Sequence, residues 1–166
     1  MKEESSTRRI ARVAILAAVY ALLTVLPPLN AIGYGPVQVR VAEALTVLPF
    51  VFPWSVWGLY LGCILSNLAS PFLAWDVTLG ALATLVAGLL TRRMPKSYLA
   101  PLPPVVVNAL AVSLYVSRLS GLPYWPVVAY IAAGETVACY ALGYPLLVYL
   151  LRNESTRQKL GGKDLT

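Results

Sequence analysis

The sequence predicts an all-α integral membrane protein with six transmembrane helices, and three observations support this prediction. Of the 166 residues, 58% are hydrophobic and only 12% are charged, whereas a soluble domain carries about 25% charged residues. The stretches 13–39, 44–75 and 97–117 contain no Asp, Glu, Lys or Arg, and an apolar run of about 18 residues is long enough to span a bilayer. The basic residues are grouped in a way that six spans explain.

Prolines, glycines and basic residues divide the apolar sequence into spans. We expect these at 10–26, 39–52, 55–68, 75–90, 99–116 and 124–151. The chain then consists of a cytoplasmic N-terminal segment (1–9), a transmembrane domain (10–151) and a cytoplasmic tail (152–166). Residues 29–38 hold two glycines and a proline, which predicts a loop or re-entrant segment. The span that follows is short for a full crossing, so we expect it to tilt or the bilayer to adjust around it.

The basic residues predict the orientation. All 13 lysines and arginines except Arg40 and Arg118 lie in the first twelve residues, the TRRMPKS connection or the C-terminal tail. Six spans place these three regions on one face, and basic residues collect on the cytoplasmic face. Both termini are therefore expected in the cytoplasm, in a multi-pass protein of the plasma membrane. Orientation also explains the net charge of +6 without a nucleic-acid partner.

Polar side chains gather in the outer half of this topology, and they are the candidate ligand-binding residues. They are Gln38, Arg40, Glu43, Asn67, Asp76, Asn108 and Glu135. An ionised side chain near the bilayer centre costs about 2.5–3.5 kcal/mol on insertion scales, so it persists where it faces protein or a watery cavity. These residues therefore predict a small polar pocket that opens outward between several helices.

Structural roles compete with this interpretation for most of these residues. Asp76 is suited to cap the fourth span, and Arg40 and Glu43 have the spacing of a local ion pair. The two asparagines fit hydrogen bonds between helices. Glu135 has no basic residue nearby in sequence and lies deep in its span, so a functional role is favoured for it.

Aromatic and small residues suggest two further surfaces. Trp75 and Trp125 fall near the outer face, where tryptophans form an interfacial belt or, alternatively, a wall for a flat ligand. The first span carries two pairs of alanines four residues apart, a spacing that lets helices approach closely. These alanines are Ala14, Ala17, Ala18 and Ala21.

The sequence also narrows the possible chemistry. It has no histidine, and its two cysteines, Cys63 and Cys139, are far apart, so we expect neither a metal site nor a cofactor. No Walker A sequence is present. An intramembrane enzyme that uses Glu43, Asp76 and Glu135 as acids and bases stays open as an alternative, but nothing fixes their spacing.

Five stretches of the sequence form a distinctive set: GPVQVRVAEALTVLPFVFP, GLYLGCILSNLASPF, DVTLGALATLVAGLLTRR, LAPLPPVVVNAL and GETVACYALGYPLL. They resemble the queuosine-precursor transporter family, the substrate-binding S components of energy-coupling factor (ECF) transporters. The similarity runs in order from about residue 10 to residue 151. The resemblance implies a six-helix, S-component-like membrane protein that binds its ligand near the outer surface. The resemblance also implies that the protein has no catalytic activity of its own.

The resemblance also implies partners and a ligand. An S component works with a transmembrane T component and two cytoplasmic ATPases, and the alanine face of the first span is the usual contact to the T component. The implied ligand is a 7-deazaguanine; another vitamin-like heterocycle is the alternative, since S components share a fold and differ in their pockets.

The ligand's chemistry suggests roles for the polar residues without settling them. Glu135 or Glu43 would accept the two N–H donors of a guanine-like edge. Arg40, Gln38 or an asparagine would donate to its carbonyl group. Asp76 or the second glutamate would balance an aminomethyl group, and Trp75, Tyr34 or Trp125 would stack on the ring.

Overall fold

The structure is a computed structural model that describes residues 6–28, 33–34 and 38–162. Every regular element in these ranges is helical, as the sequence predicts. The elements are α1 (Ser6–Val25), η2 (Val41–Phe50), α2 (Ser55–Asn67), α3 (Leu73–Trp75), η3 (Asp76–Gly80), α4 (Ala81–Thr91), η4 (Ser97–Leu99), α5 (Leu102–Ser120), α6 (Tyr124–Thr136), η5 (Val137–Gly143), α7 (Tyr144–Arg152) and α8 (Glu154–Lys159).

Several of these elements join into longer helices. Among the described residues, three helices are long and apolar enough to cross a membrane: Leu73–Thr91, Ser97–Ser120 and Tyr124–Arg152. The other three expected spans correspond to α1, which carries three arginines near its start, and to the shorter η2 and α2. The short span predicted at 39–52 is a 3-10 helix of 10 residues.

Two long helices contain π-helical segments, η3 and η5. Such bulges occur often at functional sites because they redirect side chains within a helix. Here η3 begins at Asp76 and η5 begins two residues after Glu135. Both distortions therefore adjoin acidic residues that the sequence singles out.

The fifth helix is longer than expected. It continues to Ser120, past the predicted end at residue 116. Gly121 then adopts a left-handed conformation with φ of 67°, which is the usual way for glycine to end a helix. Arg118, placed by the sequence in a loop, consequently lies in the last turn of α5.

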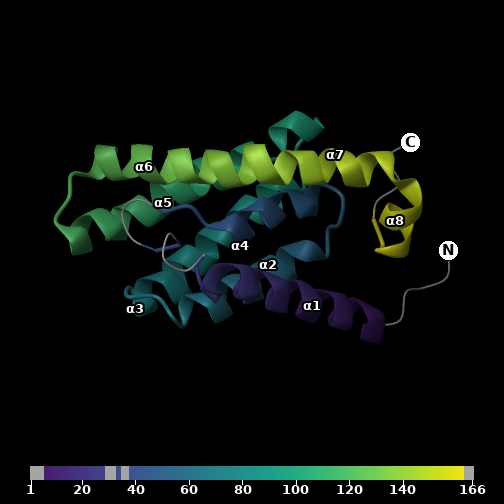
Figure 1. Cartoon of the computed structure of the whole chain (residues 1–166), viewed down its shortest axis with the longest axis horizontal. Helices are drawn as coiled ribbons and strands as arrows, with labels where there is room; N and C mark the ends of the chain where they lie inside the picture. Colours follow the sequence, from purple (N-terminus) through teal and green to yellow (C-terminus); the bar gives the residue numbers. More distant parts are fainter. Residues whose placement is uncertain (1–5, 29–32, 35–37, 163–166) are drawn as a thin grey trace.

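The two ends of the described chain lie at the same end of the molecule, where the start of α1 is near α8 (Figure 1). A hydrogen bond joins them, since Arg12 Nη2 donates to the carbonyl oxygen of Lys159 at 2.8 Å. The indole N–H of Trp54 donates to the carbonyl oxygen of Leu160 at 3.1 Å. The connection between α5 and α6 lies at the opposite end of the molecule (Figure 1).

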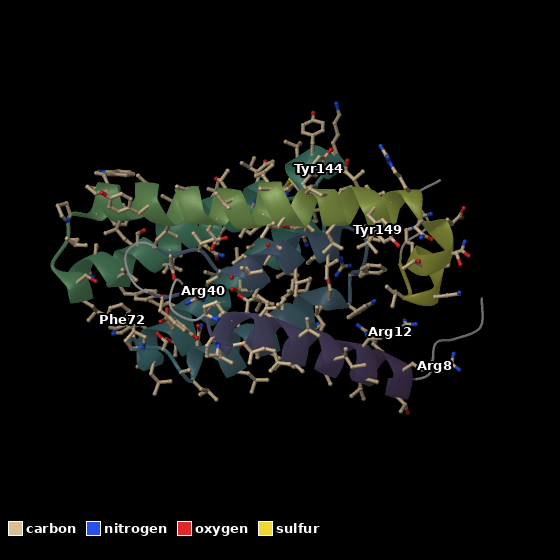
Figure 2. The ribbon with its side chains drawn as sticks, viewed as in Figure 1. Arg8, Arg12, Arg40, Phe72, Tyr144 and Tyr149 are labelled. Carbon is tan, nitrogen blue, oxygen red and sulfur yellow. The ribbon has the colours of Figure 1, made fainter. Side chains whose placement is uncertain are left out.

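The interior is built around α1, η2, α2 and α7. Tyr20, Val47, Phe52, Leu59 and Leu147 belong to its buried apolar cluster. A smaller cluster joins α5 to α6. Many large apolar side chains point outward along the helices instead, as the sticks in Figure 2 show, and a membrane protein satisfies such faces with lipid.

Candidate functional site

The centre of the candidate site is a pair of glutamates that share one amide. Glu43 on η2, Asn108 on α5 and Glu135 on α6 are 1%, 4% and 7% exposed. The Asn108 amide nitrogen donates to Glu43 Oε2 at 3.4 Å and to Glu135 Oε1 at 3.0 Å. We call Glu43 and Glu135 the carboxylate pair. Three segments far apart in the sequence thus bring buried polar side chains together.

The surroundings of the carboxylate pair are hydroxyl and thiol groups. The Tyr20 hydroxyl on α1 donates to Glu43 Oε1. Cys139 Sγ lies 3.6 Å from Glu135 Oε2, a weak contact because a thiol is a poor donor. Thr46 donates to the backbone carbonyl oxygen of Glu43 at 2.6 Å. The pair is therefore held in place by neutral donors.

One polar atom in this centre has no partner. Asn108 Oδ1 is buried and accepts no hydrogen bond from any described residue. A buried polar atom without a hydrogen bond is energetically costly. The unpartnered oxygen, beside two carboxylates, indicates a site that a hydrogen-bonding ligand would complete.

A second polar centre surrounds Asp76, and we call it the Asp76 centre. Asp76 Oδ2 accepts the hydroxyl of Ser70, and Asp76 Oδ1 accepts the hydroxyl of Tyr115 on α5. Asn67 Nδ2 donates to the Asp76 carbonyl oxygen at 2.8 Å, which confirms one hydrogen bond between helices. The predicted capping role of Asp76 is wrong, because the helix begins at Leu73 and the carboxylate binds side chains from other segments.

The charge of Arg40 interacts with an acidic residue of each centre. Its Nε donates to the Gly33 carbonyl oxygen at 2.8 Å, and its guanidinium carbon is 5.1 Å from the centroid of the Tyr34 ring. Arg40 and Glu43 form no direct ion pair within the described ranges, so the alternative of a simple local pair is wrong. The charge of Arg40 instead interacts with both Glu43 and Asp76.

The chain entering η2 runs directly against α6. Gln38 is buried, and a Cβ atom added to Gly134 would lie 1.8 Å from the Gln38 carbonyl oxygen. No side chain fits at that distance, so glycine at position 134 is what permits the contact. Because Glu135 is the next residue, the same contact fixes the segment 38–40 beside the carboxylate pair.

The remaining predicted residues lie at the periphery. Trp75 stacks on Tyr115 with ring centroids 6.2 Å apart, on the outer surface of the bundle. Trp125 is 71% exposed and packs edge-on against Tyr124, so it is not near the carboxylate pair. On α1, Ala14 and Ala18 are exposed and Ala21 is half-buried, whereas Ala17 is buried against Gly62 of α2.

Sequence reasoning missed three hydroxyl donors, Tyr20, Ser70 and Tyr115. Tyr20 was identifiable in principle, because a tyrosine in the middle of a span lies outside the interfacial belt. It shares a helix face with Leu16 and Thr24, and all three are buried. Ser70 and Tyr115 carried no comparable signal, since both occupy positions where small or aromatic residues are ordinary.

The arrangement favours the binding of hydrogen-bond donors over metal binding. Across residues 6–28, 33–34 and 38–162, no group of three or more His, Cys, Asp or Glu side chains could hold a metal ion. Two carboxylates and one amide oxygen lie together as buried acceptors. Such a set suits a small molecule that presents several N–H groups.

The fold and the site together define a helical membrane protein with a buried, carboxylate-lined centre. The sequence model of the QueT transporter family matches residues 10–152, and the chain belongs to that family, as the resemblance predicted. It is 43% identical over 84 residues to the queuosine precursor transporter QueT of Lactococcus lactis subsp. cremoris (strain MG1363). That match covers 51% of this chain and 49% of the relative, so the chain spans about half the relative's length. No solved structure matches.

Proposed function

We propose that this protein is the substrate-binding S component of an energy-coupling factor importer for a 7-deazaguanine precursor of queuosine. Membership of the QueT transporter family supports transport as the general role. The observation that carries the proposal is the carboxylate pair around Asn108, with one unpartnered amide oxygen. In this role the protein binds its ligand and catalyses no reaction.

The ligand's edge matches this set of groups. A guanine-like ring presents two adjacent N–H donors beside one carbonyl acceptor, and a carboxylate accepts two parallel donors well. Glu135 is the best candidate for this contact, because its second oxygen has only the weak Cys139 contact. Asn108 Oδ1 would accept a further N–H, and Arg40 would donate to the ring carbonyl from the loop side.

The proposed topology has six spans in the plasma membrane, with both termini in the cytoplasm. Its support is that the start of α1 and the short helix α8 lie together at one end of the molecule (Figure 1). The basic residues concentrate in the segments that this topology places inside. In this topology the segment 38–40 and the start of α3 lie in the outer half of the membrane, near the proposed ligand.

The proposed partners are a transmembrane T component and two ATPase subunits that supply the ATP hydrolysis. The exposed alanines Ala14 and Ala18 on α1 offer the small-residue face for the T component. Ala17 instead packs inside the protein against α2, which narrows the expected contact to the outward side of the helix. Co-purification with a T component and two ATPases would support this assignment over a lone enzyme or structural subunit.

The decisive experiment identifies the ligand. The chain is purified alone in detergent, denatured and searched by mass spectrometry for a small molecule, and deazaguanines are then titrated by calorimetry. A bound 7-deazaguanine with tight affinity supports the proposal. Recovery of another heterocycle would keep the transport role and replace the substrate, whereas a protein that binds nothing would contradict the proposal.

A further inference from the structure

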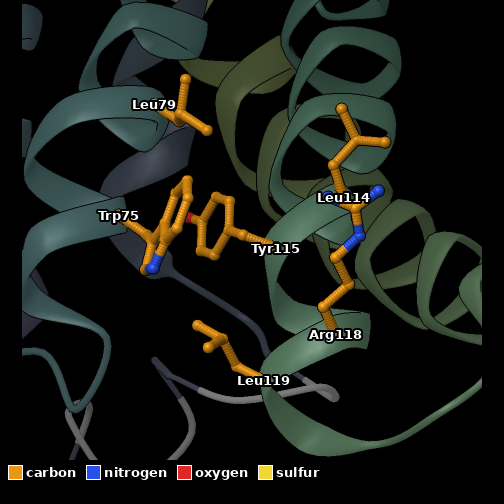
Figure 3. Close-up of a pocket in the computed structure, with 6 residues that line it drawn as sticks. All are labelled: Trp75, Leu79, Leu114, Tyr115, Arg118 and Leu119. Atoms are coloured by element: carbon orange, nitrogen blue, oxygen red, sulfur yellow. The ribbon is translucent and has the colours of Figure 1, made fainter.

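A crevice on the outside of the bundle combines an apolar lining with one cationic side chain. It lies between the start of the fourth span and α5 and measures about 410 Å³. Its lining residues are Trp75, Leu79, Leu114, Tyr115, Arg118 and Leu119. Figure 3 shows Trp75 and Leu79 on one side, with Tyr115 and Leu119 projecting from the helix opposite.

Two stacked aromatic rings form the floor of the crevice. Trp75 and Tyr115 stack with an interplanar angle of 13°, and the Tyr115 hydroxyl is held by Asp76. Leu79, Leu114 and Leu119 surround this floor and are exposed to the outside of the bundle. In a membrane protein such a surface meets lipid acyl chains rather than water.

Arg118 gives the crevice a charge preference. It has no hydrogen-bond or ion-pair partner in the part of the chain that the structure describes, and its side chain runs along α5 toward Leu114 (Figure 3). A cation in the last turn of a helix is favoured by the helix dipole, but that effect does not place it over an apolar groove. An anionic group would complete the charge, since arginine binds phosphate oxygens well.

We propose that this crevice binds one anionic phospholipid, with an acyl chain along the Trp75–Tyr115 floor and the phosphate on Arg118. The lining fits a hydrocarbon chain, and the single unpaired guanidinium fits a headgroup with net negative charge over a zwitterionic one. Because Tyr115 also donates to Asp76, the bound lipid rests on a residue that anchors the Asp76 centre. This site is separate from the carboxylate pair and does not depend on the identity of the transported ligand.

Native mass spectrometry of the full chain tests the proposal. The purified protein is exchanged into detergent with equal amounts of phosphatidylglycerol and phosphatidylcholine, and retained lipid is counted. Wild type is expected to retain one phosphatidylglycerol, and Arg118→Gln is expected to lower its retention about fivefold. Arg93→Gln, which removes an exposed arginine in the connection between α4 and α5, serves as the matched control and is expected to retain lipid as wild type does.

A second variant tests the acyl-chain contact without changing charge. Leu114→Trp fills the crevice from its outward side and is expected to abolish retention of either lipid, while Arg118 is intact. Phosphatidylglycerol with a brominated chain is expected to quench fluorescence in wild type more than in Trp75→Phe. Equal retention by wild type and Arg118→Gln, or undiminished retention by Leu114→Trp, would overturn the proposal. Displacement of the retained phosphatidylglycerol by a 7-deazaguanine would also overturn it.

Discussion

The carboxylate pair and the Asp76 centre are both buried, acidic and shared between helices, yet their oxygens are satisfied to different degrees. Both oxygens of Asp76 accept a hydroxyl, one from Ser70 and one from Tyr115. Glu43 and Glu135 instead share the amide of Asn108, whose own oxygen lacks a partner among the described residues. The Asp76 carboxylate thus has a hydroxyl donor on each oxygen, whereas Glu135 Oε2 has only the weak contact to Cys139. An amide oxygen without a partner among the described residues occurs in both centres, at Asn67 Oδ1 and at Asn108 Oδ1.

An acidic residue with a structural role can be told apart here from one that is available to bind a ligand. Burial alone does not distinguish them, since Glu43, Asp76 and Glu135 are all at least nine-tenths buried. The donors to each carboxylate set Glu135 apart. Glu43 and Asp76 have an O–H or N–H donor on both oxygens, whereas Glu135 Oε2 has only the thiol of Cys139. A buried acceptor without a good donor is costly, and a ligand can remove that cost. We therefore expect ligand affinity to depend most on Glu135, and stability to depend on Asp76.

The largest expected effect is on ligand binding by Glu135→Gln. The amide replaces an acceptor oxygen with a donor, so the two N–H groups of a guanine-like edge lose their partner. We expect the affinity for 7-deazaguanine to fall about 100-fold, measured by calorimetry, while the protein still inserts into the membrane. Glu154→Gln makes the same chemical change on α8, where the side chain is exposed, and is expected to leave the affinity unchanged. Unchanged affinity in Glu135→Gln would remove Glu135 from the site.

The next largest effect is on stability, and it concerns the Asp76 centre. Asp76→Asn disrupts acceptance of the Ser70 and Tyr115 hydroxyls, so the free energy of unfolding is expected to fall by about 2 kcal/mol. Thermal unfolding in detergent measures this loss. Tyr115→Phe removes one of the two donors and is expected to cost less. If Asp76→Asn lowered ligand affinity as much as Glu135→Gln does, the division between the two centres would be wrong.

A smaller effect tests the geometry that holds the carboxylate pair. Gly134→Ala forces the Gln38 carbonyl oxygen away from α6, since the added Cβ would lie 1.8 Å from it. Overpacking of this kind costs about 1–3 kcal/mol, and we expect the displaced segment 38–40 to lower affinity about tenfold. Gly88→Ala is the matched control, because the nearest atoms to its added Cβ are 3.6 Å away. Equal affinity in both variants would mean that the contact does not position the site.

The sequence predicted the helices better than the contacts between them. The last span, expected at 124–151, is the continuous helix Tyr124–Arg152. Its extent was predictable because apolar runs and prolines determine a helix from its own stretch of sequence. The polar residues on η2, α5 and α6 were placed in one outer pocket, and three of them do meet at Asn108. Glu43 accepts from Tyr20, 23 residues away, instead of pairing with Arg40. Such non-local choices depend on helix packing, which spacing alone does not encode.

The smallest effect concerns Tyr20, which links the proposed partner-facing helix to the binding centre. Its hydroxyl donates to Glu43, and Ala14 and Ala18 are exposed on the same helix. Tyr20→Phe keeps the ring in the core and removes one donor, a change worth about 1 kcal/mol, so affinity for 7-deazaguanine is expected to shift about fivefold. Tyr149→Phe, an exposed position on α7, is the control and is expected to bind as wild type does.

The direction of the Tyr20→Phe shift is informative as well. Without the hydroxyl, Glu43 has one acceptor oxygen more for the ligand, yet its side chain is less well held. A fall in affinity would show that positioning of Glu43 by α1 outweighs the added acceptor, so that movement of α1 on partner docking would weaken ligand binding. A rise would show that the Tyr20 hydroxyl competes with the ligand for Glu43, and displacement of α1 would then strengthen binding. Calorimetry on Tyr20→Phe and its control Tyr149→Phe separates these cases, because only a fall in ligand affinity links partner docking to ligand release.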